Sequence, residues 1–187
     1  DYNLQIAVEA AQLGFDEIQF DYVRFPDSSA PRLSAPNTEE NRVKAISGFL
    51  QEAKNRLTPY SVYVAADIFG YVCWNLNDTN IGQKLEALVS TVDYFSPMLY
   101  PSGFQYGIPG YRNPVANPYE IVYLSLKKAQ ERTNLPPLRF RPWLQAFRDY
   151  AFDRRFFNGK EIRDQIDAAE KFGSQGWMLW NPSNNYS

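Results

Sequence analysis

The sequence contains no histidine and only one cysteine, Cys73. Without histidine, the chain cannot form a Ser-His or Cys-His nucleophile pair from its own residues. One thiol and no imidazole leave only carboxylates as metal ligands, so we expect neither a metal nor a cofactor. A single cysteine also excludes an intrachain disulfide, and it does not identify the cellular compartment. Catalysis by this chain would have to use Asp, Glu, Tyr, Lys or Arg, which favours acid–base chemistry by paired carboxylates.

The charge balance and hydropathy of the chain argue against further classes of protein. The chain has 19 basic and 21 acidic side chains, a net charge of -2. This balance lacks the basic footprint of a nucleic-acid-binding protein, so we expect no nucleic-acid partner. The chain also has no apolar run of transmembrane length and no signal-peptide pattern. We expect no membrane segment within these residues, and the pattern does not define an oligomeric state.

Aromatic residues are abundant, at 16% of the chain, with 13 Tyr, 13 Phe and 4 Trp. Most of them are expected to pack in the core, where aromatic side chains contribute large buried areas. A second use is a sugar-binding cleft, because flat rings stack on the apolar faces of pyranose units. The partner expected from this composition is therefore a carbohydrate substrate.

Strand-like and helix-like segments alternate along the whole chain, which indicates βαβ units and a parallel sheet. Five strands are expected, at residues 16–21, 61–67, 94–100, 139–145 and 176–180. The helices between them are expected at residues 2–13, 38–57, 80–90, from 117 onward and 159–172. Residues 25–37 are rich in Pro and Ser, so a loop is expected there.

Two architectures fit this alternation, a doubly wound sheet and a (β/α)8 TIM-type barrel, both of the α/β class. A doubly wound sheet would usually carry a glycine-rich phosphate loop, and no GxGxxG or GxxxxGK motif is present. A barrel instead uses every strand end for its site. A polar or aromatic residue ends or directly follows every expected strand: Asp21, Asp67, Tyr100, Gln145 and Asn181. This distribution favours the barrel.

A complete barrel of this type takes about 250 residues and eight strands. We therefore expect residues 1–187 to be the C-terminal part of a single barrel domain. On this interpretation the chain supplies roughly strands four to eight, and about three N-terminal βα units are missing from it.

The most informative segment is residues 14–26, a helix end followed by a short strand and a loop. Ile18 and Phe20 are expected on one face of the strand, and Gln19 and Asp21 on the other. Carboxylates at that end of a barrel strand are usually catalytic. We therefore predict Asp21 as the nucleophile, with Arg24 three residues later keeping it ionised. The alternative is that Asp21 and Arg24 form only a structural salt bridge at the barrel mouth.

Asp67 ends the next expected strand, in an apolar run, Ala65 to Gly70. Adjacent strands lie about 4.8 Å apart, and glycosidases place their two carboxyl groups roughly 5–9.5 Å apart. An apolar setting keeps one carboxyl protonated, so we predict Asp67 as the general acid/base. The alternative is that Asp67 caps the following turn. Asp149, in a loop, is a reserve candidate for the acid.

Further residues are predicted to bind substrate. Aromatic platforms and amide groups that read hydroxyls are the side chains expected there. The set is Arg24, Gln19, Tyr100, Trp143, Gln145, Trp180 and Asn181. A loop-packing tyrosine at Tyr100 and a buried tryptophan at Trp143 are the structural alternatives.

The segment Glu17 to Pro26, together with 65–70, 96–102, 141–147 and 177–182, resembles a known bacterial family. That family is the putative glycosyl hydrolase domain, classed as a domain of unknown function and related to α-amylase-like barrels. The resemblance implies a TIM-type barrel that hydrolyses glycosidic bonds, in an extracellular or cell-envelope setting. In α-amylase-like relatives the nucleophilic Asp follows strand four and the acid follows strand five, where Asp21 and Asp67 stand. The acid is commonly Glu in those relatives, which is a departure here.

The same strand also resembles, faintly, the chitinase-type signature of acidic residues at every second position before a catalytic Glu. Those places hold Gln19, Asp21 and Val23. Val23 cannot protonate a leaving group, so the chitinase mechanism is rejected for this chain. Two other functions stay open besides O-glycosidic hydrolysis by two carboxylates. One is a non-catalytic carbohydrate-binding barrel, and the other is a lyase acting on cell-wall sugar.

Overall fold

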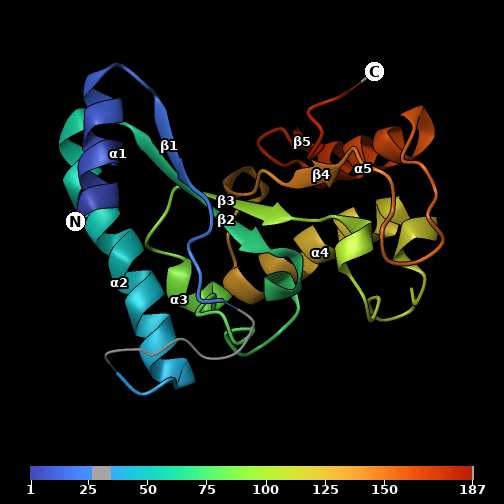
Figure 1. Cartoon of the computed structure of the whole chain (residues 1–187), viewed down its shortest axis with the longest axis horizontal. Helices are drawn as coiled ribbons and strands as arrows, with labels where there is room; N and C mark the ends of the chain where they lie inside the picture. The colour runs from blue at the N-terminus through green and yellow to red at the C-terminus, as the bar shows by residue number, and fades with distance from the viewer. Residues whose placement is uncertain (27–34, 187) are drawn as a thin grey trace. The chain divides into compact units, whose positions relative to one another are not determined.

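A computed structural model describes residues 1–26 and 35–186 (Figure 1). The predicted loop at 25–37 therefore lies partly outside the described residues. The strands are β1 (Glu17–Phe20), β2 (Tyr63–Phe69), β3 (Tyr94–Met98), β4 (Trp143–Gln145) and β5 (Met178–Trp180). The helices are α1 (Tyr2–Gln12), α2 (Glu39–Leu57), α3 (Leu85–Leu88), α4 (Pro118–Thr133) and α5 (Gly159–Phe172). No helix among the described residues has the length and apolar character to cross a membrane.

The strands follow one another in the sheet in chain order, β1-β2-β3-β4-β5. The pairs β1–β2, β3–β4 and β4–β5 are parallel. Parallel neighbours need crossover connections, and helices provide them along this chain. The chain divides into two compact units: residues 1–68 with 75–95, called unit 1, and residues 69–74 with 96–187, called unit 2.

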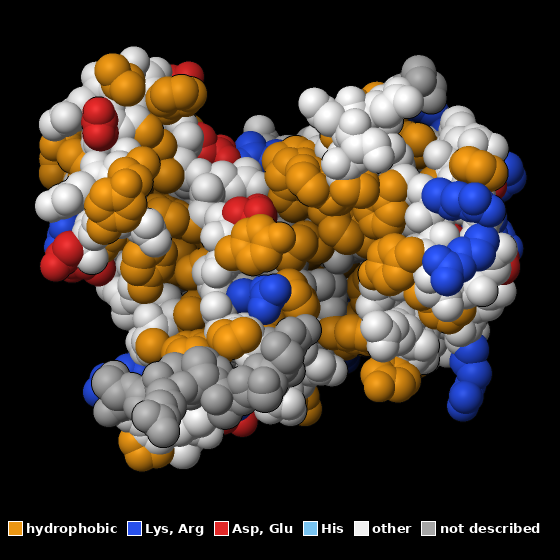
Figure 2. Space-filling model, viewed as in Figure 1, with side chains coloured by type: hydrophobic (Ala, Val, Ile, Leu, Met, Phe, Trp, Pro, Cys, Tyr) orange, Lys and Arg blue, Asp and Glu red, His pale blue; other side chains and the backbone are white. Residues whose placement is uncertain are grey.

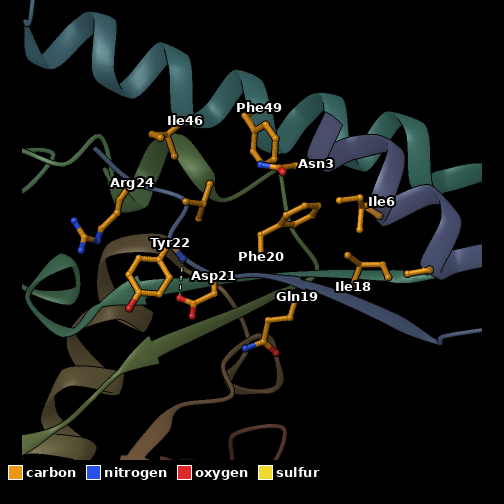
Figure 3. A pocket seen from close by; sticks show the side chains of 13 residues that line it. Asn3, Ile6, Ile18, Gln19, Phe20, Asp21, Tyr22, Arg24, Ile46 and Phe49 are labelled. Atoms are coloured by element: carbon orange, nitrogen blue, oxygen red, sulfur yellow. Dashed lines mark hydrogen bonds between the residues drawn. The ribbon is translucent and has the colours of Figure 1, made fainter. Parts of the chain in front are cut away.

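In unit 1, helices α1 and α2 cover one face of β1. Ile18 and Phe20 point from β1 toward these helices, where Phe20 meets Phe49 edge-on at 5.3 Å between ring centroids (Figure 3). Gln19 and Asp21 point to the opposite side of the strand (Figure 3). The predicted two-residue alternation of β1 is therefore confirmed, and it leaves the polar side chains of this strand on the face away from the helices.

In unit 2, α4 and α5 pack against each other. Phe104, Phe140, Ile121 and Leu126 are all 1% exposed or less, so they form a close-packed aromatic and aliphatic core. Phe140 meets Phe172 of α5 edge-on at 5.9 Å.

Several helix ends follow the expected capping chemistry. Thr38 precedes α2, and its Oγ1 accepts a hydrogen bond from the backbone N–H of Asn41 at 3.3 Å. Asn158 and Glu161 form a reciprocal capping box at the start of α5. Gly173 ends that helix with φ of 87°, a conformation that costs glycine little.

The predicted helix at 80–90 is wrong in extent, because only Leu85–Leu88 is helical. Thr79, Asn80 and Gly82 have positive φ values of 55°, 59° and 84°. The buried carboxylate of Asp78 accepts the N–H groups of Asn80 and Gly82, so this segment is a fixed turn. Side chains that bond nearby backbone compete with helix formation in this way.

Strand bounds also differ from expectation. β2 continues to Phe69, so Asp67 lies inside the strand rather than at its end. β4 begins only at Trp143, because Pro142 has no N–H to give the ladder. β5 begins at Met178, since Gly176 has φ of 73° and is not extended.

Candidate active site

Asp21 follows β1 directly and is exposed to solvent. Its Oδ1 accepts the backbone N–H of Tyr22 at 2.7 Å. Tyr22 has φ of 53°, a left-handed conformation that is uncommon for a bulky residue. This turn folds the chain back beside the carboxylate, and strained backbone of this kind is frequent at functional sites. The carboxylate of Asp21 is accessible to an incoming molecule.

Asp67 has the opposite environment, with only 4% of its surface exposed. Gln19 Nε2 donates a hydrogen bond of 2.5 Å to Asp67 Oδ1. Gln19 therefore orients the Asp67 carboxyl.

The register of β1 and β2 relates the two aspartates. Phe20 is the partner of Ala66, so Asp21 and Asp67 come one position beyond the last assigned pair. Neighbouring strands lie about 4.8 Å apart, and partners in register share a face. The hydrogen bond from Gln19 to Asp67 shows that the polar faces of the two strands coincide. Unit 1 thus brings Gln19, Asp21 and Asp67 to one edge region of its strands.

Gln83 was not identified from the sequence, yet it links both strand ends. Its side chain is 1% exposed, and its Nε2 donates to the carbonyl oxygens of Val23 at 3.2 Å and Asp67 at 3.1 Å. One buried amide therefore ties the segment after β1 to β2. The Asn-, Asp- and Gly-rich run at 75–82 signals a turn, but nothing in it shows which strands the turn reaches.

The turn that carries Gln83 is itself held by an ion pair. Arg42 of α2 donates from Nε to Asp78 Oδ2 at 2.6 Å and from Nη2 to Oδ1 at 2.9 Å. Asp78 is 1% exposed and Arg42 is 8% exposed. Burial opposes the charge of Asp78, but the Arg42 guanidinium and the N–H groups of Gly82 and Asn80 outweigh it and lower its pKa.

Arg24 was predicted to keep Asp21 ionised, and this role stays a prediction. Its guanidinium lies 5.6 Å from the centre of the Tyr22 ring, and its Nη1 donates to the carbonyl oxygen of Phe25 at 3.2 Å. Among the described residues no ion pair joins it to Asp21. Figure 3 shows the Arg24 side chain directed away from the Asp21 carboxylate.

A hollow of about 560 Å³ lies beside β1 in unit 1 (Figure 3). Its wall combines apolar side chains of the two helices with the polar end of the strand. The residues that matter for chemistry in this wall are Gln19, Asp21, Tyr22 and Arg24. The candidate nucleophile therefore borders a space that a ligand could enter.

Unit 2 has a larger hollow, of about 1120 Å³, beyond the ends of β4 and β5. Tyr100, Trp180 and Asn181, predicted as substrate-binding residues, all line it. Tyr100 meets Phe147 edge-on at 5.5 Å, and Trp143 meets Trp180 edge-on at 6.1 Å. Tyr100, Trp180 and Asn181 thus share one hollow, and Tyr100 and Trp180 each belong to a ring pair.

Two of the amides in unit 2 are engaged by the protein itself. Gln145 is 0% exposed, donates to Ser102 Oγ at 2.8 Å and to the Phe147 carbonyl at 3.1 Å, and accepts from the Ser102 N–H at 3.0 Å. A buried amide with these partners cannot read a sugar hydroxyl, so Gln145 positions the surrounding loop instead. Asn181 donates to the carbonyl oxygens of Ala146 and Asn185, at 2.6 and 2.7 Å.

Asp149 is unsuited to the reserve role of proton donor. It is 2% exposed, and its carboxylate accepts the Ser102 hydroxyl at 2.6 Å and four backbone N–H groups. Burial opposes its charge, but the Ser102 hydroxyl and the backbone N–H groups outweigh this and lower its pKa to about 2. Asp149 is therefore ionised at neutral pH and holds its loop in shape.

Residues 1–186 of the chain match the model of the family described as "Putative glycosyl hydrolase domain". Among curated proteins, none matches the chain. The family match covers nearly every residue, including both strand ends described above.

Solved structures share the fold. The spore cortex-lytic enzyme SleL of Bacillus megaterium QM B1551 is 15% identical with a TM-score of 0.64, covering 98% of this chain and 49% of its own. The Group IV chitinase of Ostrinia furnacalis is 12% identical with a TM-score of 0.65, covering 98% and 66%.

The PgaB (BpsB) glycoside hydrolase domain of Bordetella bronchiseptica is 16% identical with a TM-score of 0.53, covering 76% and 38%. The chain thus spans between two fifths and two thirds of the length of these structures. At such identities the likeness establishes the fold, a parallel α/β sheet that forms part of a barrel.

Proposed function

The chain belongs to the putative glycosyl hydrolase domain family, and from that premise we propose that it hydrolyses O-glycosidic bonds in an oligo- or polysaccharide. One observation carries the proposal: Asp21 and Asp67 each come one position beyond Phe20 and Ala66, the last paired residues of two neighbouring parallel strands. A pair of carboxyl groups is what most glycosidases use. We further propose that the five strands are strands four to eight of one barrel domain, completed by about three βα units outside this chain.

In the proposed mechanism the exposed Asp21 is the nucleophile. Its carboxylate borders the hollow of unit 1, so the anomeric carbon of a bound sugar could approach it. Buried Asp67, whose carboxyl Gln19 orients, is the general acid. Different environments for two carboxyl groups are how such pairs divide the acid and nucleophile roles.

In unit 2 the proposed sugar contacts are Tyr100, Trp143, Trp180 and Asn181. In unit 1 the proposed substrate contact is Gln19. Trp180 is 45% exposed, which leaves its ring available for stacking. The rival function is a non-catalytic carbohydrate-binding barrel that uses the same rings. The two functions differ in one measurable respect, which is turnover.

The test uses the full-length protein with a panel of oligosaccharides. Asp21→Asn is nearly isosteric but cannot serve as a nucleophile, so hydrolysis should fall by about 10³-fold or more while binding persists. Asp16→Asn is the matched control, because Asp16 is an exposed aspartate just before β1 and should leave hydrolysis unchanged. Binding by wild type without hydrolysis of any sugar would support the lectin-like rival.

The role of Asp67 has a separate test based on the leaving group. Asp67→Asn should slow cleavage of natural oligosaccharides far more than cleavage of nitrophenyl glycosides, because a nitrophenolate needs little protonation to leave. Equal slowing of both substrates would remove Asp67 from the acid role. Unchanged hydrolysis by Asp21→Asn would remove Asp21 from the mechanism.

A further inference from the structure

We infer that the hollow of unit 2 is a groove for several rings of an uncharged pyranose oligosaccharide, with its outer wall formed by residues 148–157. The inference deepens the proposed function and rests on it for the substrate class. Hydrophobic side chains gather over β4 and β5 on the face shown in Figure 2. The exposed rings of the groove, its charged side chains and the hydrogen bonds that hold residues 148–157 support the inference.

The rings are exposed in the way that sugar stacking requires. Tyr150, Phe156 and Tyr186 line the groove and are 51%, 60% and 53% exposed. Tyr150 stacks on Phe147, with the ring planes 13° apart and the centroids 6.2 Å apart. Paired parallel rings present a flat apolar platform, which the C–H face of a pyranose can cover.

The charge of the groove selects an uncharged ligand. Among the described residues that line this groove, Arg148 is the only one with a charged side chain. Its guanidinium lies 4.6 Å from the centre of the Phe156 ring, and its Nε donates to the Arg154 carbonyl at 2.6 Å. The described part of the lining therefore has no carboxylate to hold a cation, and its guanidinium already has protein contacts.

The size and polar groups of the groove fit an oligosaccharide better than a single sugar. Its volume of about 1120 Å³ is at the upper limit of small-molecule sites, which hold roughly 300–1,000 Å³. Asn158 and Ser183 add an amide and a hydroxyl group to the lining. Amides and hydroxyls both donate and accept, as sugar hydroxyls require.

The outer wall is fixed by Asp149. Its carboxylate accepts the N–H groups of Ala151, Phe152, Asp153 and Arg154 at 2.8–3.1 Å. Arg154 has φ of 63°, so this tight loop depends on those contacts. The carboxylate thereby preorganises the loop that carries Tyr150 and Phe156, and preorganisation reduces the entropic cost of binding.

Calorimetry on full-length protein carrying Asp21→Asn tests the groove, with maltotetraose, cellotetraose and chitotetraose as uncharged probes. Tyr150→Ala and Phe156→Ala should each weaken the binding of whichever probe binds by about tenfold, the effect of a contact ring in a binding site. Tyr106→Ala is the control, because Tyr106 is an 86% exposed ring of unit 2 outside the groove. Asp149→Asn should also weaken binding, although Asp149 itself makes no ligand contact.

Several results would overturn the inference. These are no binding of any probe, equal binding by the groove variants and the Tyr106→Ala control, or tighter binding of tetragalacturonate than of the uncharged probes. The proposed hydrolysis is judged separately, by turnover in protein with Asp21 intact. Hydrolysis with KM unchanged in Tyr150→Ala and Phe156→Ala would reject the groove alone. Probe binding that needs these rings, with no turnover, would reject the hydrolase alone.

Discussion

In each unit a buried aspartate holds a loop in place, Asp78 in unit 1 and Asp149 in unit 2. The two aspartates use different hydrogen-bond partners. Asp78 in unit 1 combines two backbone N–H groups with a guanidinium from α2. Asp149 in unit 2 relies on a serine hydroxyl and on four N–H groups of its own loop. The first ties a turn to a helix, and the second folds a loop around itself.

Because of this difference, the two anchors affect different parts of the molecule. The Asp78 turn carries Gln83, so its anchor reaches the strand ends that bear Asp21 and Asp67. The Asp149 loop carries the exposed rings of Tyr150 and Phe156, so its anchor shapes a surface. Disturbing Asp78 should therefore affect folding and turnover together, whereas disturbing Asp149 should affect binding first.

The largest effect is expected for Asp78→Ala. Removing the carboxylate leaves the guanidinium of Arg42 buried without its charged partner, which typically costs about 3–5 kcal/mol. The free energy of unfolding from urea titration measures this loss. The double variant Arg42→Met with Asp78→Leu should recover part of it, because an apolar pair removes the unpaired charge. A single variant as stable as wild type would show that the pair does not hold the turn.

A smaller loss, roughly 2 kcal/mol, is expected for Asp149→Asn. The folded pKa of Asp149 is lowered from 3.8 to about 2, so its stabilisation is complete above pH about 4 and is lost as pH falls toward 2. The difference in unfolding free energy between wild type and Asp149→Asn should therefore shrink over that interval. A difference that stays constant from pH 6 to pH 2 would contradict the assigned charge.

Local sequence pattern predicted the parts of the fold that depend on local physics. The alternation of Ile18 and Phe20 with Gln19 and Asp21 specified the two faces of β1, and Thr38 specified the start of α2. These features follow from the two-residue period of a strand and from capping geometry, both readable within a few residues. The family resemblance was confirmed by the match over residues 1–186.

Features that depend on distant partners could not be predicted in this way. The helix expected at 80–90 fails because Asp78 bonds Asn80 and Gly82, and the 36-residue separation of Asp78 from Arg42 hides the anchor. Gln83 is equally invisible, since its acceptors lie 60 and 16 residues away. The catalytic roles of Asp21 and Asp67 stay predictions, which turnover alone can test.

The smallest effect on stability is expected for Gln83→Met, which keeps the volume of the side chain and removes its donor. Two buried carbonyl oxygens, of Val23 and Asp67, lose a partner, which costs about 1–3 kcal/mol in total. Gln51→Met is the matched control, because Gln51 is an exposed amide on α2 and should change nothing.

Turnover gives the sharper measurement at Gln83. If the amide only stabilises the fold, the remaining folded protein should keep its kcat, KM and pH profile. If it also positions Asp67 against the segment that follows Asp21, kcat should fall at nearly constant KM, because misplaced catalytic groups weaken the transition state more than the bound ground state. A normal kcat per folded molecule would restrict Gln83 to stability, and the link between the Asp78 turn and the strand ends would then be structural alone.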